Sequence, residues 1–407
     1  MVAKSTNNLV GQPIFKQILG LIPKEKFDLL AFESNTDHYY KAFPAWKHLT
    51  TMLFGIYSRC DSMIEVCDGM QTLQGKLNHL GFDSAPAKST AGDGLRKRDN
   101  EFFKSLYFML IEHFNDFLSV SRPSTADVKN LFIFDSTTIR LFSDVMKGVG
   151  RNPKGDGKKK GGLKVHMLTS ADSQTPQFVN ITEGKQHDKT QLKLLSLPPF
   201  STITFDRAYN DYKAYNSFTK RQIYFVGRIK RNAVYTVKEV LTTEGNSTLT
   251  GVKREELIEL SYKENKEDQT FILKKVTYID EKNREYEFIT NNLAYTGQQV
   301  ADIYKKRWDI ELLFKKLKQN FQLHYFYSDS ENGIKTQIWC TLIAHLLLMI
   351  VKAKAQSIKA FSTIAALVRI YLISTLDMYW VVVNCRRTYI KKNKTKNKGP
   401  SIQLTIF

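Results

Sequence analysis

Apolar positions in the first part of the chain recur with the period of an α-helix. Four of them share one helical face before Pro23 interrupts the pattern: Phe15, Ile18, Leu19 and Ile22. A second run with this period extends from His48 to Met70. The polar stretch from Asp83 to Arg98 predicts a boundary or turn before a further helix from Glu101 to Phe117. We therefore expect a helical N-terminal domain over residues 1–95.

From about residue 129 the pattern changes to short apolar runs that are typical of strands. The order of elements is three strands, a helix, a strand, a helix and a strand. Their ranges are 131–134, 163–170, 177–182, 187–195, 201–205, 212–220 and 223–229. This order is typical of a ribonuclease H-like α/β sheet. We therefore predict that residues 96–230 hold a lead-in helix and the first part of such a core.

Residues 231–292 break the alternation, because short β-prone pieces follow one another with polar stretches between them. The pieces are 233–237, 256–260, 271–279 and 286–290. We predict an all-β insertion there, followed by the last part of the core over residues 293–385. Within that part, the apolar runs 338–351 and 361–383 predict helices that together cover the sheet. The run 338–351 is shorter than the roughly 20 residues that span a bilayer, so we interpret it as a buried helix.

The net charge of the chain indicates the kind of partner that it binds. Sixty Lys and Arg residues against forty Asp and Glu give a formal net charge of +20. A globular chain this basic favours a polyanionic partner, with nucleic acid first and an anionic membrane surface second. The basic tail, residues 386–407, either adds attraction to phosphates or only improves solubility.

The first residues and the cysteines suggest a compartment. The N-terminus lacks the charged-then-apolar order of a secretory signal, so we expect a cytoplasmic protein without a membrane span. The four cysteines form no CxxC pair, which predicts free thiols in a reducing cell.

A glycine-rich basic segment from Lys147 to Lys164 predicts a hairpin tip that grips the DNA backbone. Lys158, Lys159 and Lys160 are its densest cluster. The segment lacks the GK[ST] ending of a phosphate-binding P-loop.

Nearby, His166 and His187 have no partners at metal-ligand spacing, so we interpret both as structural.

The run from Tyr304 to Lys318 predicts a helix with two distinct stripes. At roughly 100° per residue, four polar residues fall within about 60° of one another: Tyr304, Arg307, Glu311 and Lys318. A neighbouring stripe can face a core: Ile303, Ile310, Phe314 and Leu317. Taken alone, the run is equally compatible with a plain surface helix that pairs Glu311 with Lys315.

Three carboxylates form a candidate set of metal ligands. Asp135 and Asp206 each end a predicted strand, and Glu311 lies on the later helix. An isolated Asp135 would more simply cap a turn, but three acids can hold two Mg²⁺ ions about 3.5–4 Å apart for phosphoryl transfer. Ligands that are all oxygens suit Mg²⁺ or Mn²⁺.

These residues resemble the motifs of DDE transposases of bacterial insertion sequences, specifically the insertion-sequence-four family. That family has the pattern Y-x2-R-x3-E-x6-K, and this chain matches all four positions with Tyr304, Arg307, Glu311 and Lys318. Its Asp-Arg-Gly-Tyr segment reads Asp206-Arg207-Ala208-Tyr209 here, with alanine in place of glycine. The resemblance covers residues from about 130 to 350, and its β-rich insertion lies at the same place.

The resemblance implies roles for the site residues. Asp135, Asp206 and Glu311 would be catalytic and would hold two Mg²⁺ or Mn²⁺ ions. Tyr304, Arg307 and Lys318 would hold phosphates of the transposon end, with Arg207 doing the same beside Asp206. Trp308 would stack on a base displaced from the duplex, although ordinary packing explains it at least as well.

The resemblance also implies an activity. The family nicks the terminal inverted repeats of its element, typically through a hairpin intermediate, and the freed 3′-hydroxyl then attacks target DNA. It implies a homodimer on paired double-stranded ends in a bacterial cell, bound to the nucleoid. Two alternatives stay open: a ribonuclease H-like nuclease that does not join strands, and a DNA-binding relative without activity.

Overall fold

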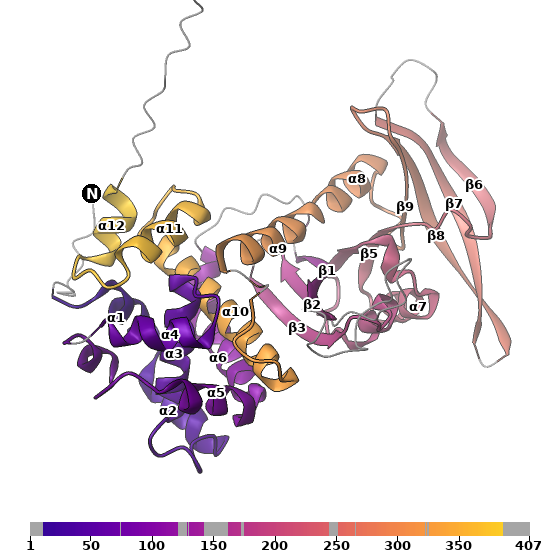
Figure 1. Cartoon of the computed structure of the whole chain (residues 1–407). Helices are drawn as coiled ribbons and strands as arrows, with labels where there is room; N and C mark the ends of the chain where they lie inside the picture. Colours follow the sequence, from indigo (N-terminus) through magenta and orange to yellow (C-terminus); the bar gives the residue numbers. More distant parts are fainter. Residues whose placement is uncertain are drawn as a thin grey trace, which may run out of the picture.

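The computed structural model describes residues 11–73, 75–120, 128, 130–141, 162–171, 175–243, 251–264, 266–321, 323 and 325–385. Lys158, Lys159 and Lys160 and the basic tail lie outside these residues. The described part has a helical body at one end and a long twisted sheet at the other (Figure 1).

Six α-helices precede the sheet in the described part of the chain: α1 (Ile14–Leu19), α2 (Lys24–Glu33), α3 (Ala45–Ser58), α4 (Met63–Gln71), α5 (Lys88–Lys97) and α6 (Asn100–Val120). The four apolar residues predicted to share a face are all buried. The predicted run 48–70 is two helices, because Arg59 adopts a left-handed conformation that ends α3. Ser62 then caps α4 by accepting a hydrogen bond from the Glu65 amide. The stretch 83–98 contains α5, where a turn was expected.

The predicted order of strands is confirmed, and one of the two predicted helices is found as an α-helix. The first five strands are β1 (Leu131–Arg140), β2 (Gly162–Ser170), β3 (Pro176–Glu183), β4 (Thr202–Phe205) and β5 (Tyr224–Arg228). They lie side by side in the order β3-β2-β1-β4-β5, with β4 parallel to both of its neighbours. Helix α7 (Tyr212–Lys220) matches its prediction, whereas the segment predicted as a helix at 187–195 is the 3₁₀ helix η2 (Asp188–Leu194).

The segment 231–292 contains four strands that extend the same sheet. They are β6 (Tyr235–Thr243), β7 (Gly251–Glu264), β8 (Glu267–Ile279) and β9 (Glu285–Thr290). Strand β9 pairs antiparallel with β5, so the sheet has nine strands in the order β3-β2-β1-β4-β5-β9-β8-β7-β6. The outer strands form a long arm that projects from the core (Figure 1).

Five helices follow the sheet in the described part of the chain: α8 (Gly297–Lys305), α9 (Trp308–Phe321), α10 (Glu331–Lys354), α11 (Phe361–Tyr371) and α12 (Met378–Asn384). Helix α10 packs on α6 and α3, and it shares one core with Ile133 and Val165 of the sheet. By length and composition α10 could cross a membrane, but 94% of its most apolar window is buried in the protein. The prediction of a buried helix at 338–351 is therefore confirmed.

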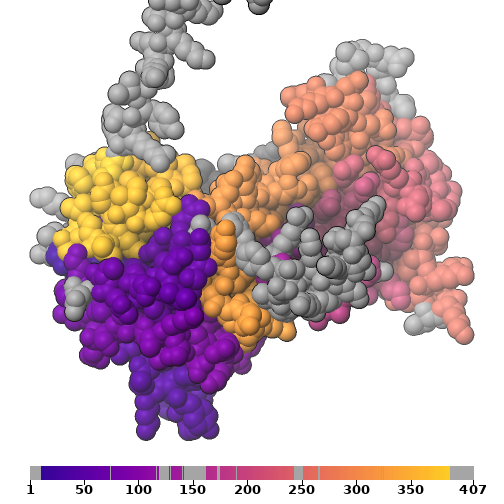
Figure 2. Space-filling view, in the orientation of Figure 1, coloured from indigo at the N-terminus to yellow at the C-terminus, as the bar shows by residue number. Residues whose placement is uncertain are grey.

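The two last helices do not cover the sheet as predicted. Helices α11 and α12 pack mainly on α1, α3, α9 and α10. Figure 2 shows their yellow surface set against the indigo N-terminal helices. The apolar pattern of 361–383 indicates burial correctly, but it carries no information about which neighbour provides it.

All four cysteines are free thiols.

Candidate active site

The run from Tyr304 to Lys318 is not one helix. Helix α8 ends at Lys305 and α9 begins at Trp308, with a tight turn between them. In that turn the amide of Lys306 donates to the Ile303 carbonyl at 3.2 Å, and the amide of Arg307 donates to the Tyr304 carbonyl at 3.0 Å. The predicted apolar stripe is nevertheless buried at all four positions. The turn leaves Arg307 between two helices, with only 7% of the residue exposed.

Asp135 and Asp206 occupy equivalent positions on two neighbouring parallel strands, β1 and β4. The pairing of β1 with β4 ends at Phe134 opposite Phe205, and each acid is the next residue. Strand β1 continues to Arg140 through its pairing with β2, so the prediction that the first strand ends at Asp135 is wrong. The acid is held by strand pairing on one side, which gives it more rigid support than a turn would.

Arg307 joins Asp135 to Glu311. Its Nη1 donates to Asp135 Oδ2 at 3.1 Å and to Glu311 Oε1 at 2.6 Å. The Arg307 side chain is 9% exposed and that of Asp135 is 14% exposed, while Glu311 is 36% exposed. Two acids far apart in the sequence therefore meet at one guanidinium nitrogen.

Electrostatics link the three acids. Burial raises the pKa of Asp135 to about 6, and the negative charges of Asp206 and Glu311 act in the same direction. The Ser136 amide, which donates to Asp135 Oδ1 at 2.8 Å, and the Arg307 guanidinium oppose this rise. Asp206 is thus close enough to act on the pKa of Asp135.

The donor set fits a divalent cation in chemistry, and partly in geometry. Carboxylate oxygens are the ligands that Mg²⁺ and Mn²⁺ prefer. Asp135 and Glu311 already share one cation, the Arg307 guanidinium. Across the described residues, however, no three His, Cys, Asp or Glu side chains lie close enough to hold an ion together. The described residues therefore form no ready-made site with three such ligands.

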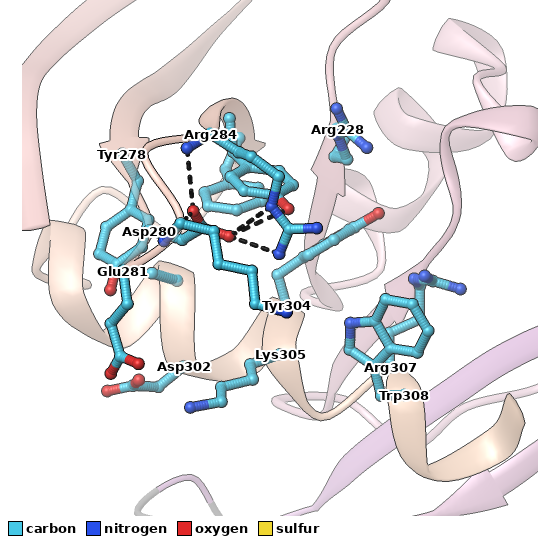
Figure 3. A pocket seen from close by; sticks show the side chains of 14 residues that line it. Arg228, Tyr278, Asp280, Glu281, Arg284, Asp302, Tyr304, Lys305, Arg307 and Trp308 are labelled. Carbon is cyan, nitrogen blue, oxygen red and sulfur yellow. Dashed lines mark hydrogen bonds and ion pairs between the residues drawn. The ribbon is translucent and has the colours of Figure 1, made fainter. Parts of the chain in front are cut away.

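Two hollows flank Arg307. One is an open groove lined by eight residues: Asp135, Ser136, Thr137, Glu311, Phe314, Lys315, Lys318 and Gln319. In it Lys318 Nζ donates to the Thr138 carbonyl at 3.1 Å. The other is a pocket of about 350 Å³ between α8, the end of β5 and the β8–β9 turn (Figure 3). Tyr304, Arg307 and Trp308 line it.

The predicted DNA-binding residues differ in exposure. Tyr304 is 6% exposed, and its hydroxyl has no hydrogen-bond partner among the described residues. Trp308 is 56% exposed, and the Arg307 guanidinium lies 5.3 Å from its ring. Arg207 is half-buried in the 3₁₀ turn η3 (Arg207–Tyr209) and lines neither hollow.

The sequence pattern did not indicate two further features of the site. Arg228, at the end of β5, lines the pocket with Tyr304, and its guanidinium lies 5.0 Å from the Tyr286 ring (Figure 3). Behind Asp135, Asp188 accepts from Ser136 Oγ at 3.1 Å and from Lys164 Nζ at 2.8 Å. Both features depend on strand pairing across long sequence separations, which no local motif reveals.

Two family models match parts of this chain. Residues 127–347, more than half of the chain, match the family described as "Transposase DDE domain". Residues 10–83 match a domain of unknown function, DUF4372.

Three relatives carry related names. The chain is 26% identical to "Putative transposase y4zB" of Sinorhizobium fredii, over 46% of this chain and 53% of that protein. It is 25% identical to "Probable transposase for insertion sequence element IS5377" of Geobacillus stearothermophilus, over 64% of this chain and 66% of that protein. It is 22% identical to "Transposase for insertion sequence element IS231E" of Bacillus thuringiensis subsp. finitimus, over 70% of this chain and 68% of that protein. The chain therefore matches between about half and two thirds of the length of these relatives.

Proposed function

The chain belongs to the family of DDE transposase domains, and on this premise we propose that it is a DNA transposase that moves an insertion sequence by cut and paste. The substrates are the double-stranded terminal inverted repeats of the element and a target DNA. A net charge of +20 supports a polyanionic substrate of this kind. The bacterial cytoplasm, with the protein bound to the nucleoid, is the compartment that such a substrate implies.

In this proposal Asp135, Asp206 and Glu311 are the catalytic acids. The observation that supports it best is the meeting of Asp135 and Glu311 at the Arg307 guanidinium, with Asp206 at the same level of the next strand. Two Mg²⁺ or Mn²⁺ ions bound by these acids would supply Lewis-acid activation of the attacking and leaving oxygens. Asp135 and Glu311 line the groove, where a phosphate could reach them.

The basic and aromatic residues around the acids orient the DNA. Arg307 can contact a phosphate with two parallel N–H groups, and Lys318 can do so as a point charge from the groove. Burial raises the pKa of Tyr304, which keeps its hydroxyl protonated as a hydrogen-bond donor. Trp308 is exposed at the pocket and can stack on a displaced base, as expected for a hairpin intermediate. Arg207 beside Asp206, and Lys158, Lys159 and Lys160, are assigned to further phosphates of the DNA.

The reaction proceeds in four steps at one site. Water attacks a phosphate at the transposon end, and the bond to the 3′-oxygen breaks to leave a 3′-hydroxyl and a 5′-phosphate. That hydroxyl attacks the opposite strand and displaces a 3′-oxygen of the flanking DNA, which closes a hairpin on the element end. Water then opens the hairpin and restores the 3′-hydroxyl, which attacks a phosphate of the target and displaces a 3′-oxygen there. Each step builds negative charge on phosphate oxygens, which the Arg307 and Lys318 side chains could stabilise.

The remaining parts have supporting roles in the proposal. Helices of residues 1–95 contact the transposon end, and the β-rich segment 231–292 is an insertion in the catalytic core, which residues 96–230 and 293–385 complete. The basic tail, residues 386–407, adds unspecific attraction. A homodimer that holds two ends together is the expected assembly.

A joining assay tests the proposal. The full chain is incubated with Mg²⁺, a target plasmid and a duplex that carries the inverted repeat flanking its own gene. Nicking at the repeat, and transfer of a pre-cut end to the plasmid, are the expected results. Nicking without transfer would instead favour the nuclease, and end binding without either reaction would favour an inactive relative.

A further inference from the structure

Arg307 bridges Asp135 and Glu311, and it is also proposed to contact a DNA phosphate. It cannot do both with the same nitrogen atom. Its Nη1 is occupied by Asp135 and Glu311, at 3.1 and 2.6 Å. Its Nε is buried and, within the described part of the chain, has no hydrogen-bond partner. The neighbouring Tyr304 hydroxyl interacts with this guanidinium and, within the described residues, has no other partner. Because a buried N–H without an acceptor is costly, Nε marks a place where an acceptor from outside the chain fits.

Both oxygens of Asp135 are already engaged. Oδ1 accepts from the Ser136 amide and Oδ2 accepts from Arg307. The Ser136 amide belongs to strand β1, which is paired on both sides at Phe134 and cannot withdraw easily. Arg307 lies in the turn between α8 and α9 and can change its side-chain rotamer at lower cost. Of the two partners of Asp135, the guanidinium is therefore the one that an approaching cation would displace.

The guanidinium and a divalent cation cannot share this position. A bound Mg²⁺ lies about 2.0–2.1 Å from its oxygens, closer than the nitrogen now lies to either carboxylate. Two cations around the same oxygens also repel one another strongly in a site of low exposure. The pocket lined by Tyr304 and Trp308 adjoins Arg307 on the other side (Figure 3), and a phosphate there offers the guanidinium two acceptor oxygens.

We propose that Arg307 is an exchangeable counter-ion, which bridges Asp135 and Glu311 until a DNA phosphate in this pocket takes it and thereby frees the acids for metal. The inference rests on the proposed function and concerns the regulation of the same site. Its consequence is reciprocal: DNA raises the affinity for metal, and metal raises the affinity for DNA by the same factor. Metal-dependent cleavage is thus confined to protein that already holds an end.

Binding of Mn²⁺ to the full chain, measured by calorimetry with and without the end duplex, tests this coupling. For the unaltered protein, the duplex should tighten Mn²⁺ binding by about fivefold or more. Arg307→Gln should bind Mn²⁺ more tightly than the unaltered protein without DNA, and the duplex should change its affinity less than twofold. Lys220→Gln removes an exposed charge at the end of α7, which lines neither the groove nor the pocket, and it should keep the coupling.

Two results separate failure of this inference from failure of the proposed function. If Asp135→Asn abolishes Mn²⁺ binding but Arg307→Gln binds no more tightly than the unaltered protein, the counter-ion role is wrong and the metal site stands. If Asp135→Asn leaves Mn²⁺ binding unchanged, both are wrong. Arg307→Lys keeps the charge, so in a folded protein it should restore weak Mn²⁺ binding without DNA, and tight binding by this variant would also overturn the inference.

Discussion

Asp135 and Asp206 are each the next residue after a directly paired couple, Phe134 and Phe205, on two parallel strands. This relationship brings the carboxylates to one edge of the parallel ladder from positions far apart in the chain. Since the phenylalanines on both strands are fully buried, a shift in register would turn them out of the core and would also displace the two acids. The placement of the first two acids is therefore a property of the sheet.

The first prediction concerns the third carboxylate. Glu311→Gln keeps the size of the side chain and a hydrogen-bond acceptor for Arg307 but removes the charge. We expect Mg²⁺-dependent cleavage of the end duplex to fall by a factor on the order of a hundred or more, because metal stabilisation of the transition state amounts to several kcal/mol. End binding, measured by fluorescence anisotropy, should change little. Cleavage at near-normal rates would remove Glu311 from the proposed set.

The second prediction concerns Lys318, which lies in the groove with Asp135 and Glu311. Lys318→Gln should weaken end binding and reduce the slope of log affinity against log salt by about one, because one phosphate contact is lost. Lys220→Gln is the matched control. It removes an exposed lysine at the end of α7, a helix that packs on a different core from α9. Equal salt slopes for the two variants would exclude the role of Lys318.

The third prediction follows from the raised pKa of Asp135, about 6. A carboxylate must lose its proton to bind metal, so protonation competes with Mn²⁺ as the pH falls through this value. We expect the affinity for Mn²⁺ to be nearly constant above about pH 7 and to fall by up to about tenfold per pH unit below pH 6. Calorimetry between pH 5 and 8 measures it. A midpoint near pH 4, the ordinary range of an aspartate, would contradict the prediction.

The fourth prediction concerns His166, which is fully buried and hydrogen-bonded to Thr182 Oγ1 at 2.9 Å. Burial lowers the pKa of His166 to about 4, with Lys164 acting in the same direction against Asp188. The unfolded chain, with an ordinary histidine pKa near 6.5, takes up the proton first. Stability should therefore be complete above about pH 6.5 and fall between pH 6.5 and 4, by up to about 1.4 kcal/mol per pH unit.

His166→Gln isolates this contribution, since Asp135 acts in the opposite direction over part of the same range. Melting temperatures at pH 7 and pH 5 are the measurement. The melting temperature of the unaltered protein should fall more between pH 7 and pH 5 than that of the His166→Gln variant. Equal losses would mean that His166 is not held neutral in the folded protein.

Local sequence signals predicted the elements that local interactions determine. Helix α7 matches its prediction because Asp211 caps it, accepting hydrogen bonds from the amides of Lys213 and Ala214. The strands of the arm were predicted too short because their ends are polar. Strands β7 and β8 continue to Glu264 and from Glu267, beyond the predicted pieces 256–260 and 271–279. There Lys263 pairs with Asp268 across the two strands, and such cross-strand pairs appear in the sequence as polar interruptions.

The break between α8 and α9 was not predictable from the pattern. Residues 304–318 fit one uninterrupted helix, whereas the turn is accompanied by a tertiary contact of Arg307 with Asp135. The motif named the residues that meet, but not that a guanidinium lies between the acids. That arrangement arises from folding over a separation of 172 residues.

The most direct test of the whole account is a crystal structure of the full chain with its end duplex and Mn²⁺, in which anomalous scattering locates the ions. The account predicts Mn²⁺ within about 2.2 Å of carboxylate oxygens from Asp135, Asp206 and Glu311, with Arg307 on a phosphate. Mn²⁺ bound elsewhere, or Asp206 without contact to any ion, would contradict it.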